Sequence, residues 1–512
     1  MAMTAYGGPI RNVVVVMFEN RSYDNVLGWL YNSANPAPFK TPPPKQAALN
    51  GLTGSETNAN PSGGAPIPVG HAVTTWSGYP GTAVPVIDPG EAFEAMAQQI
   101  LGLTTPPSPA VNPYANGAPG TLGFMQGFAY NYALQSTVTP GLYVTLTDVM
   151  NYFTPSQMPA TALLANAFAV CDQWFASAPC QTFPNRTFAH CAAPGVSDIL
   201  GIHTYLLNDA DYILRTSLPS VFAVLDQAYP SAVGSSVPNW KVYYQDLPLS
   251  ALLVPYVAGA PISQLVPFDP TFYDDLSKGT LPKYAFIEPR YYIDPESPSL
   301  VPSSNHPGNS GLIPGPLTPY GSTGQTNPPI DAAQGDQLLA SIALALMLTG
   351  LGTGPVNYWE QSLLVMTYDE HGGTYDHVTP PTAVNPIAGG RALNGFDCTR
   401  YGVRVPAVVI SPYVLAGSTI TPPGSTPFDH SSIVKTVWEC FNLASLTGVA
   451  SLTQRDLNAP SLLDALTSTS DRRTSVLPRL RASAAPRRPA PAPSEAARRR
   501  ILAALRDRTF RR

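Results

Sequence analysis

Unbroken apolar runs at three points in the chain predict strands that are buried on both faces. Val13 to Phe18 (VVVVMF), Ser362 to Tyr368 (SLLVMTY) and Val405 to Ile410 (VPAVVI) are short and rich in β-branched residues. Such runs are typical of a parallel sheet that helices cover on both faces. Gln334 to Leu348 is predicted as a helix before the second run. This alternation predicts an α/β fold with a central, mostly parallel β-sheet flanked by helices.

Two further helices and two long loops complete the predicted pattern. Gly90 to Leu101 (GEAFEAMAQQIL) is predicted as a helix with Asp88 as its N-cap, and Thr161 to Val170 (TALLANAFAV) as another. Asn35 to Val86 and Pro298 to Pro329 are rich in Pro, Gly, Ser, Thr and Asn. Such stretches predict long loop insertions between the regular elements.

We expect residues 1–470 to form one large domain. Residues 196–280 separate two groups of motifs and are predicted to be an insertion or a lid. Residues 471–512 form a basic tail that is rich in Pro, Ala and Arg. Within this tail we predict a linker over 479–493 and a short helix over 494–508.

Charge is unevenly distributed along the chain. The net charge is −5, but 13 arginines and only three acidic residues follow position 470. The tail is therefore strongly basic, and the preceding residues carry 15 basic and 30 acidic side chains. An acidic body excludes a nucleic-acid-binding protein. The tail alone has the charge to contact an anionic membrane peripherally, and the alternative is a solvated extension.

The five cysteines give no metal or redox motif, because none has C-x-x-C spacing. Cys180 and Cys191 leave two alternatives open, a disulfide between them or two buried free thiols. The N-terminus lacks the basic and apolar regions of a signal peptide. The longest apolar stretch, Leu338 to Leu348, is too short to span a bilayer. We therefore expect a soluble protein, either cytoplasmic or secreted by a dedicated route.

Acidic residues follow two of the predicted buried strands. Glu19 and Asn20 come after the first run, and Asp369 and Glu370 come after the second. Converging carboxylates repel each other unless a cation lies between them. Oxygen ligands favour one divalent Ca²⁺, Mg²⁺ or Mn²⁺ ion, with Zn²⁺ as a further candidate. The alternative is that these acids cap helices or are solvated strand ends.

The segment from Ala178 to Thr187 (APCQTFPNRT) contains a candidate nucleophile. A threonine such as Thr182 can attack phosphorus when a nearby metal ion lowers the pKa of its hydroxyl. Arg186 has the geometry to bind either a carboxylate or a phosphate. The alternative is an ordinary turn with an arginine salt bridge.

Three histidines stand in settings that resemble motifs: His306 before Pro, and His371 and His377 after acidic residues. A single histidine is more often structural than catalytic, so these are weak signals alone. The chain has no Gly-x-Ser-x-Gly, Walker-A or Gly-x-Gly-x-x-Gly stretch. A serine α/β-hydrolase and the nucleotide-binding folds therefore have no support.

Six motifs in the same order resemble those of the bacterial phospholipase C / acid phosphatase phosphoesterase family, which also includes plant non-specific phospholipases C. They lie within about residues 10–440. They are Glu19-Asn-Arg-Ser-Tyr-Asp24 with Gly28, Thr182-Phe-Pro-Asn-Arg186, His306-Pro307, Tyr368-Asp-Glu-His-Gly-Gly-Thr-Tyr-Asp-His-Val378 with Pro380-Pro381, Gly402-Val-Arg-Val-Pro406 with Ser411-Pro412, and Asp429-His-Ser-Ser432.

The resemblance implies an alkaline-phosphatase-like fold and a role for each site residue. The cation would be held by Glu19, Asn20, Asp369, Glu370 and the Thr182 oxygen. Thr182 would form a phosphothreonine intermediate that water releases. Asn20 and His306 would contact phosphate oxygens, and His306 would give a proton to the leaving group.

One position departs from the family pattern. Many relatives carry a histidine after an Asp-Pro-Gly stretch, whereas Asp88-Pro-Gly is followed here by Glu91. A carboxylate with an ordinary pKa cannot donate a proton. Glu91 is therefore a candidate for binding the metal or a cationic part of the substrate, such as choline.

The resemblance makes 1–470 a catalytic domain and predicts a hydrolase of phosphoric esters. The favoured function is a phospholipase C that cleaves phospholipid headgroups. The alternative within the same class is an acid phosphatase, because the nucleophile contacts only phosphorus. An alternative of another class is an inactive lipid-binding module, which the presence of Thr182, Asp369 and Glu370 disfavours.

Overall fold

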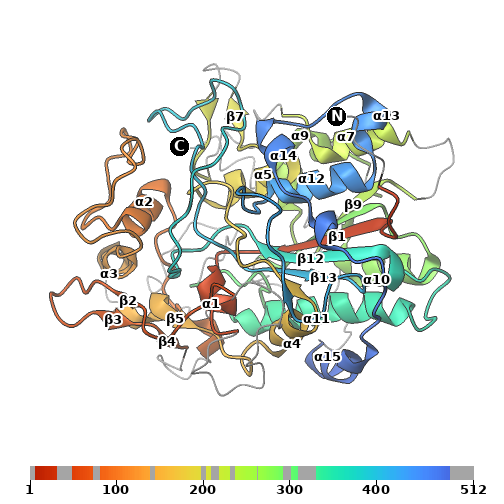
Figure 1. Ribbon diagram of the computed structural model, residues 1–512, viewed down its shortest axis with the longest axis horizontal. Helices are drawn as coiled ribbons and strands as arrows, with labels where there is room; N and C mark the ends of the chain where they lie inside the picture. The colour runs from red at the N-terminus through yellow and green to blue at the C-terminus, as the bar shows by residue number, and fades with distance from the viewer. Residues whose placement is uncertain are drawn as a thin grey trace.

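One eight-stranded sheet forms the centre of the molecule, and helices lie on both of its faces (Figure 1). The computed structural model describes residues 6–30, 49–72, 81–138, 145–197, 203–208, 218–230, 237–261, 263–291, 301–308 and 330–484. The strand order is β10-β9-β11-β1-β12-β13-β6-β14. The strands are β1 (Asn12–Phe18), β6 (Ala169–Val170), β9 (Trp240–Tyr244), β10 (Leu265–Pro267), β11 (Tyr284–Glu288), β12 (Ser362–Tyr368), β13 (Ala407–Ile410) and β14 (Ser418–Thr419).

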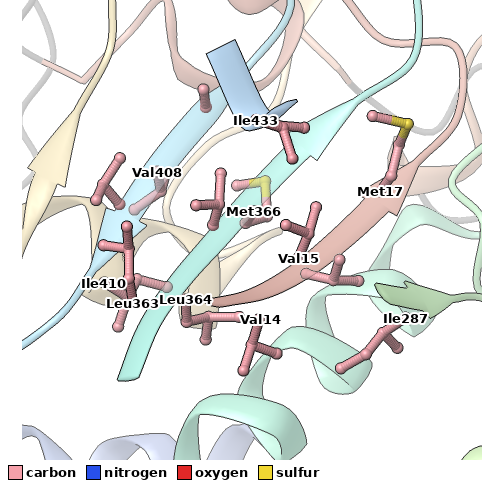
Figure 2. Packing of buried hydrophobic residues seen from close by; sticks show 14 of the residues in the cluster. Val14, Val15, Met17, Ile287, Leu363, Leu364, Met366, Val408, Ile410 and Ile433 are labelled. Atoms are coloured by element: carbon pink, nitrogen blue, oxygen red, sulfur yellow. The ribbon is translucent and has the colours of Figure 1, made fainter. Parts of the chain in front are cut away.

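The first apolar run of the chain forms the central strand β1. β1 is parallel to β11 on one side and to β12 on the other, so that Val15 pairs with both Phe286 and Val365. Every residue of β1 and β12 is buried, which explains why neither sequence alternates between apolar and polar residues. Figure 2 shows their side chains packed with Ile433 from a covering helix.

Four helices make the main layers that cover the sheet. α5 (Thr182–Cys191) and α12 (Ser431–Cys440) lie on one face, and α4 (Pro159–Ala167) and α11 (Ala332–Thr349) lie on the other (Figure 1). The other α-helices are α1 (Tyr23–Leu27), α2 (Phe93–Leu101), α3 (Phe128–Val138), α7 (Val221–Ala228), α8 (Leu249–Leu253), α9 (Pro255–Ala258), α10 (Phe268–Lys278), α13 (Leu443–Thr447), α14 (Gln454–Asn458) and α15 (Leu477–Ser483).

Short elements make up the rest of the described secondary structure. Three two-stranded sheets pair β2 (Thr57–Asn58) with β3 (Ile67–Pro68), β4 (Gly70–His71) with β5 (Asn151–Tyr152), and β7 (Val196–Ser197) with β8 (His203–Thr204). The 3₁₀ helices are η1 (Gly81–Ala83), η2 (Leu146–Met150), η3 (Trp359–Gln361), η4 (Leu462–Ala465) and η5 (Thr474–Val476).

The predicted fold class, a mostly parallel central sheet between helices, is confirmed. β13 is antiparallel to both β12 and β6, whereas the other neighbouring strands of this sheet pair in parallel. The direction of β13 could not be read from its composition, because a short buried strand is apolar in either direction.

The range 196–280, which the sequence predicts to be an insertion or a lid, contributes strands to the central sheet. β9 and β10 fall in this range and form one edge of the central sheet. Both are short, and polar or proline residues surround them, which hid them among loops. The predicted loops 35–86 and 298–329 lie partly outside the described residues.

Two predicted helix boundaries also differ from the structure. α2 begins at Phe93, and its N-cap is Ala92 without a side-chain hydrogen bond, so Asp88 is not the cap. α4 ends at Ala167, and the following Ala169–Val170 pairs with β13 as β6. In the second case the hydrogen bonds of the sheet override a local sequence that favours a helix.

The start of the predicted tail is part of the folded domain. α15 packs against α11 and α4, and its Leu480 is fully buried in the main core. The predicted linker over 479–493 therefore begins inside a helix. The helix predicted over 494–508 lies outside the described residues.

All five cysteines are free and buried, so the Cys180–Cys191 disulfide does not form in this structure. α11 is the one helix, within the described parts of the chain, whose length and composition suit a membrane span. However, 72% of that apolar stretch is buried inside the protein. Its apolar character is therefore explained by packing beneath the sheet.

We predict that Leu480→Ala lowers the free energy of unfolding by about 2–4 kcal/mol, because it leaves a cavity between α15 and α11. Urea denaturation followed by circular dichroism measures the change. Arg481→Ala, an exposed position on the same helix, is the control and should change stability by less than about 0.5 kcal/mol. Equal effects of the two substitutions would contradict the docking of α15.

Candidate active site

The carboxyl ends of β1 and β12 lie side by side and bring the two acidic motifs together. Phe18 pairs with Tyr368 in the parallel register, so Glu19 and Asp369 follow at the same edge of the sheet. The backbone N–H of Asn20 donates a hydrogen bond to Asp369 Oδ1 at 3.0 Å. This edge is where α/β proteins place their binding sites.

α5 places its first turn over the same edge through Arg186. Arg186 Nε donates to Asp369 Oδ2 at 3.0 Å, and Nη2 donates to the carbonyl oxygens of Met17 and Phe18 at 3.3 and 3.1 Å. Residues i and i+4 of a helix share one face. Thr182, four residues before Arg186, is therefore held on the face of α5 that meets the strand ends.

The role predicted for Arg186, contact with substrate, has no support in these contacts. Its side chain is 1% exposed and is paired with Asp369, which is fully buried. The sequence allowed Arg186 to bind either a carboxylate or a phosphate, and the structure shows it bound to the carboxylate of Asp369. Arg186 positions α5, although its Nη1 is buried without a hydrogen-bond partner.

Asn20 joins two more of the predicted site residues. Its side-chain Nδ2 donates to Glu91 Oε2 and lies 2.9 Å from His306 Nε2. Gln181, the N-cap of α5, also donates to Glu91, at 3.3 Å. His306 Nδ1 lies 2.7 Å from the carbonyl oxygen of Pro307, and because a carbonyl only accepts, Nδ1 carries a proton.

His306 is held in its charged form by the surrounding acids. Burial alone would lower the pKa of His306, but Asp88, Glu91 and Glu19 outweigh it and raise this pKa well above its ordinary value. Nε2 lies 3.6 Å from Glu91 Oε2, and Nδ1 lies 3.8 Å from Asp88 Oδ1. His306 therefore has a proton to give at neutral pH.

The acids at the strand ends have the properties of a cation site. Burial is the main cause that raises the pKa of Glu19 to about 7, and burial also raises the pKa values of Asp369 and Glu370. Asn20 Oδ1 and Glu370 Oε1 are buried without a hydrogen-bond partner. Oxygen atoms in this state are satisfied by a hard divalent cation.

Two other groups within the described ranges have ligand atoms that all lie within 4.8 Å of one another. They are Asp88 with Glu91 and His306, and Asp24 with Asp376 and His377. Glu19, Asp369 and Glu370 do not form such a group in this structure. Their assignment as metal ligands, together with Asn20 and Thr182, stays a prediction.

Arg404 forms an ion-pair network with the second of these groups, Asp24, Asp376 and His377. Its Nε donates to Asp376 Oδ1 at 3.0 Å, and its Nη2 donates to Asp24 Oδ1 at 3.0 Å. His377 lies on the other oxygen of Asp24, with Nδ1 at 2.6 Å. The guanidinium supplies the positive charge that these carboxylates need. The network joins α1, the loop after β12 and the segment before β13.

The remaining histidines near the site have structural contacts. His371 Nε2 lies 2.8 Å from Gln99 Oε1, and burial lowers the pKa of His371 to about 3, so this ring is neutral. His430 Nε2 lies 2.6 Å from the carbonyl oxygen of Asp369 and supports the turn that follows β12. His430 was not among the predicted site residues, although its Asp-His-Ser-Ser motif was a signal.

Gly372 is required where the two acidic motifs meet. Its φ is +58°, and a Cβ at this position would lie 2.2 Å from the carbonyl oxygen of Asn20. Its N–H also donates to Glu370 Oε2 at 2.6 Å. A side chain would therefore push apart the segments that carry the candidate ligands.

The sequence found most of the residues that meet here and missed two. Asp369, Asn20, Glu91, Arg186 and His306 are linked by the contacts above, and Glu19, Thr182 and Glu370 lie beside them in the chain. Gln181 and Asp88 were not predicted as site residues. Gln181 directly precedes Thr182 in its motif, which was the available signal.

Transfer of a phosphoryl group needs a nucleophile, positive charge near the phosphate oxygens and a proton donor for the leaving group. This edge of the sheet offers candidates for all three. The fold and these residues therefore define the protein as a phosphoric-ester hydrolase. The "Phosphoesterase family" model matches residues 10–444, and the chain belongs to this family.

Several relatives of this chain are named phospholipases C. The chain is 31% identical to non-specific phospholipase C6 of Arabidopsis thaliana over 479 residues, which cover 91% of this chain and 74% of that protein. Non-specific phospholipase C3 of the same plant is 30% identical, with 91% and 75% covered. Phospholipase C A of Mycobacterium tuberculosis (strain H37Rv) is 26% identical, with 84% and 72% covered.

Solved structures match only distantly. The lipoteichoic acid synthase LtaP from Listeria monocytogenes has a TM-score of 0.31 and 12% identity, with 59% of this chain and 70% of that chain covered. A protein in the alkaline phosphatase superfamily from Vibrio parahaemolyticus also has a TM-score of 0.31, with 10% identity, 60% and 64% covered.

We predict that Gly372→Ala lowers the free energy of unfolding by about 2 kcal/mol or more and reduces hydrolysis at least about tenfold. The first effect combines positive φ with a backbone clash, and the second follows from displaced Asn20 and Glu370. Thermal unfolding and p-nitrophenyl phosphorylcholine turnover measure the two effects.

Gly389→Ala is the matched control, because Gly389 has φ +74° but open space around its Cβ position. It should show only the smaller cost of positive φ and normal turnover. If Gly372→Ala behaves like this control, the close approach to Asn20 has no functional importance.

Proposed function

We propose that this protein is a phospholipase C that uses a divalent cation and forms a phosphothreonine intermediate at Thr182. The observation that carries the proposal is the buried Arg186–Asp369 ion pair. It fixes the start of α5 against the acids at the strand ends. The Thr182 hydroxyl, the acids that follow β1 and β12, and the charged His306 would then lie around one substrate position.

The cation would be held by Glu19, Asn20, Asp369, Glu370 and the Thr182 oxygen. Their all-oxygen character favours Ca²⁺, Mg²⁺ or Mn²⁺ over Zn²⁺. A bound cation would lower the pKa of the Thr182 hydroxyl and neutralise charge on the phosphate. The partnerless Asn20 Oδ1 and Glu370 Oε1 support this assignment.

In the first step Thr182 Oγ loses its proton to solvent and attacks phosphorus. The bond between phosphorus and the leaving-group oxygen breaks, and this oxygen takes a proton from His306. The high pKa of His306 keeps that proton available at neutral pH. The products are diacylglycerol, the free alcohol, and a phosphothreonine at position 182 whose phosphate still carries the headgroup.

In the second step neutral His306 takes a proton from water, and the resulting hydroxide attacks phosphorus. The bond between phosphorus and Thr182 Oγ breaks, and the threonine regains a proton from solvent. The sum of the two steps is addition of one water across the ester bond. Asn20 Nδ2, which lies 2.9 Å from His306 Nε2, would donate a hydrogen bond to a phosphate oxygen in both steps.

The substrate proposal rests on the relatives, several of which are named phospholipases C. Glu91 adds a feature of this chain. Hydrogen bonds and the charge of His306 lower the pKa of Glu91 against the opposing effect of burial, so Glu91 is ionised. A carboxylate beside the phosphate position suits a headgroup with a positive charge, such as choline.

We predict that Thr182→Ala reduces kcat on the order of 10⁴-fold or more, because no other hydroxyl is held at the start of α5. Thr182→Ser keeps the hydroxyl and should retain measurable turnover. Thr187→Ala on the same helix should keep near-normal turnover. Turnover by Thr182→Ala equal to wild type would remove Thr182 as the nucleophile.

The class of ester is tested by comparing phosphatidylcholine, p-nitrophenyl phosphorylcholine and p-nitrophenyl phosphate, before and after chelation. Release of diacylglycerol that stops on chelation is the expected result. Turnover of the monoester alone would identify an acid phosphatase instead. No turnover of any ester after addition of Ca²⁺, Mn²⁺ or Zn²⁺ would leave only a lipid-binding module.

We predict that affinity for Mn²⁺ rises with pH up to about 7 and then levels off. The pKa of Glu19 is raised to about 7, so below that pH the metal-free protein holds a proton that a cation must displace. The expected slope is about tenfold in affinity per pH unit for each displaced proton. Isothermal titration calorimetry between about pH 5.5 and 8 measures it.

Asp369→Asn should weaken Mn²⁺ binding strongly at every pH in this range. Asp24→Asn, in the neighbouring ion-pair network, is the control and should keep the pH dependence. A flat affinity profile in the wild-type protein would contradict the assignment of Glu19 as a ligand.

A further inference from the structure

Exposed apolar side chains gather on the segments that border the candidate site. Ten large apolar side chains are exposed among the described residues, and four of them stand on these segments. Val301 lies on the segment that leads into His306. Val111 precedes Tyr114, whose ring packs against Phe93 at 5.6 Å, close in the chain to Glu91. The other two are Leu207 and Leu393.

Leu207 lies directly against the start of α5. The carbonyl oxygen of Leu206 accepts from the N–H of Gln181 at 3.3 Å. Asn208 donates its N–H to Gln181 Oε1 at 2.9 Å and accepts from the N–H of Phe183 at 2.7 Å. Leu207 is held between these contacts and is 40% exposed, so its side chain faces solvent beside Thr182.

Leu393 stands at the tip of a tight turn on the same side. The N–H of Ala392 donates to the carbonyl oxygen of Phe396 at 2.7 Å, and the ring of Phe396 packs against Phe93 at 5.1 Å. The carbonyl oxygen of Arg391 accepts from the N–H of Thr204, which joins this turn to the segment of Leu207. Leu393 is 81% exposed, the largest value among these ten side chains.

The net charge of the chain indicates which kind of membrane these leucines can enter. The residues before position 471 carry 15 basic and 30 acidic side chains, so an anionic membrane would repel them. Zwitterionic headgroups impose no such cost, and apolar side chains gain free energy when they enter the acyl boundary. Single exposed leucines are ordinary, but these two stand on segments that a hydrogen bond joins, and the segment of Leu207 contacts the start of α5.

We propose that Leu207 and Leu393 insert into a zwitterionic phospholipid bilayer and hold the mouth of the site against it. The inference rests on the proposed function, because only an enzyme with a lipid substrate needs this contact. Substrate would then pass from the bilayer to Thr182 without crossing bulk water. Binding and chemistry are carried by different residues, so they can be separated by experiment.

Leu207→Asp and Leu393→Asp are tested alone and together in the full chain. Each should weaken binding to phosphatidylcholine vesicles by about tenfold, the loss expected for one leucine that no longer leaves water. Vesicle hydrolysis should fall in parallel and recover at high lipid concentration. Turnover of soluble p-nitrophenyl phosphorylcholine should stay normal, because neither leucine is part of the chemistry.

Leu351→Asp is the matched control. Leu351 is 55% exposed but follows α11 and precedes β12, at the end of the sheet opposite to the site. It should leave vesicle binding unchanged. Leu393→Trp is a second probe, since tryptophan suits the membrane interface. It should keep binding and show a blue shift of its fluorescence on adding vesicles.

Three results would overturn the proposal. They are unchanged vesicle binding by the double aspartate variant, an equal loss in Leu351→Asp, and wild-type binding that requires anionic lipid and ignores the leucines. Failure of the proposed function looks different. In that case wild-type protein would hydrolyse neither diester, while the vesicle-binding comparison would still decide the role of the leucines.

Discussion

The Arg186–Asp369 ion pair joins a helix to a sheet at the point where all the candidate chemistry lies. Both side chains are buried, so the free energy of each charge depends on the other. Asp369 also accepts the backbone N–H of Asn20 and of Glu370. One carboxylate therefore orients both acidic motifs and α5, the helix that carries the proposed nucleophile. The arrangement of the candidate cation ligands and the position of Thr182 both depend on this interaction.

A second buried arginine supports this arrangement from behind. Arg404 binds Asp24 and Asp376, which belong to the same two acidic motifs but lie further along the chain. These residues looked like further chemistry in the sequence, because acids and a histidine stand together. Their contacts are instead with a guanidinium, which neutralises them. In each motif, the later acidic residue has a structural role: its ion pair with Arg404 holds the segment that carries the candidate site residues.

The sequence predicted the parts of the fold that depend on local pattern. β1 and β12 were found almost to the residue, because a strand buried on both faces needs an unbroken apolar run. β9 and β10 were missed, and the direction of β13 was unknown, because pairing partners far away in the chain decide both. The local pattern of apolar and polar residues contains no information about such long-range contacts.

For the candidate site, the sequence predicted most of the residues but not all of their contacts. Residue types and the family resemblance identified Asn20, Glu91, Asp369 and His306, which do meet. The partner of Arg186 and the site position of Asp88 followed only from the structure, since a guanidinium fits a carboxylate and a phosphate equally well. The structure also shows why Gly372 lies between the acids: no Cβ fits beside Asn20.

The central position of β1 has a consequence for how the chain folds. β1 is made first, yet its partners β11 and β12 come from much later in the sequence, and Val15 pairs with Val365. At roughly 5–20 residues per second of synthesis, this strand emerges tens of seconds before its neighbours exist. An apolar strand without partners is prone to aggregate. Productive folding in the cell therefore depends on shielding β1 until β11 and β12 have been translated.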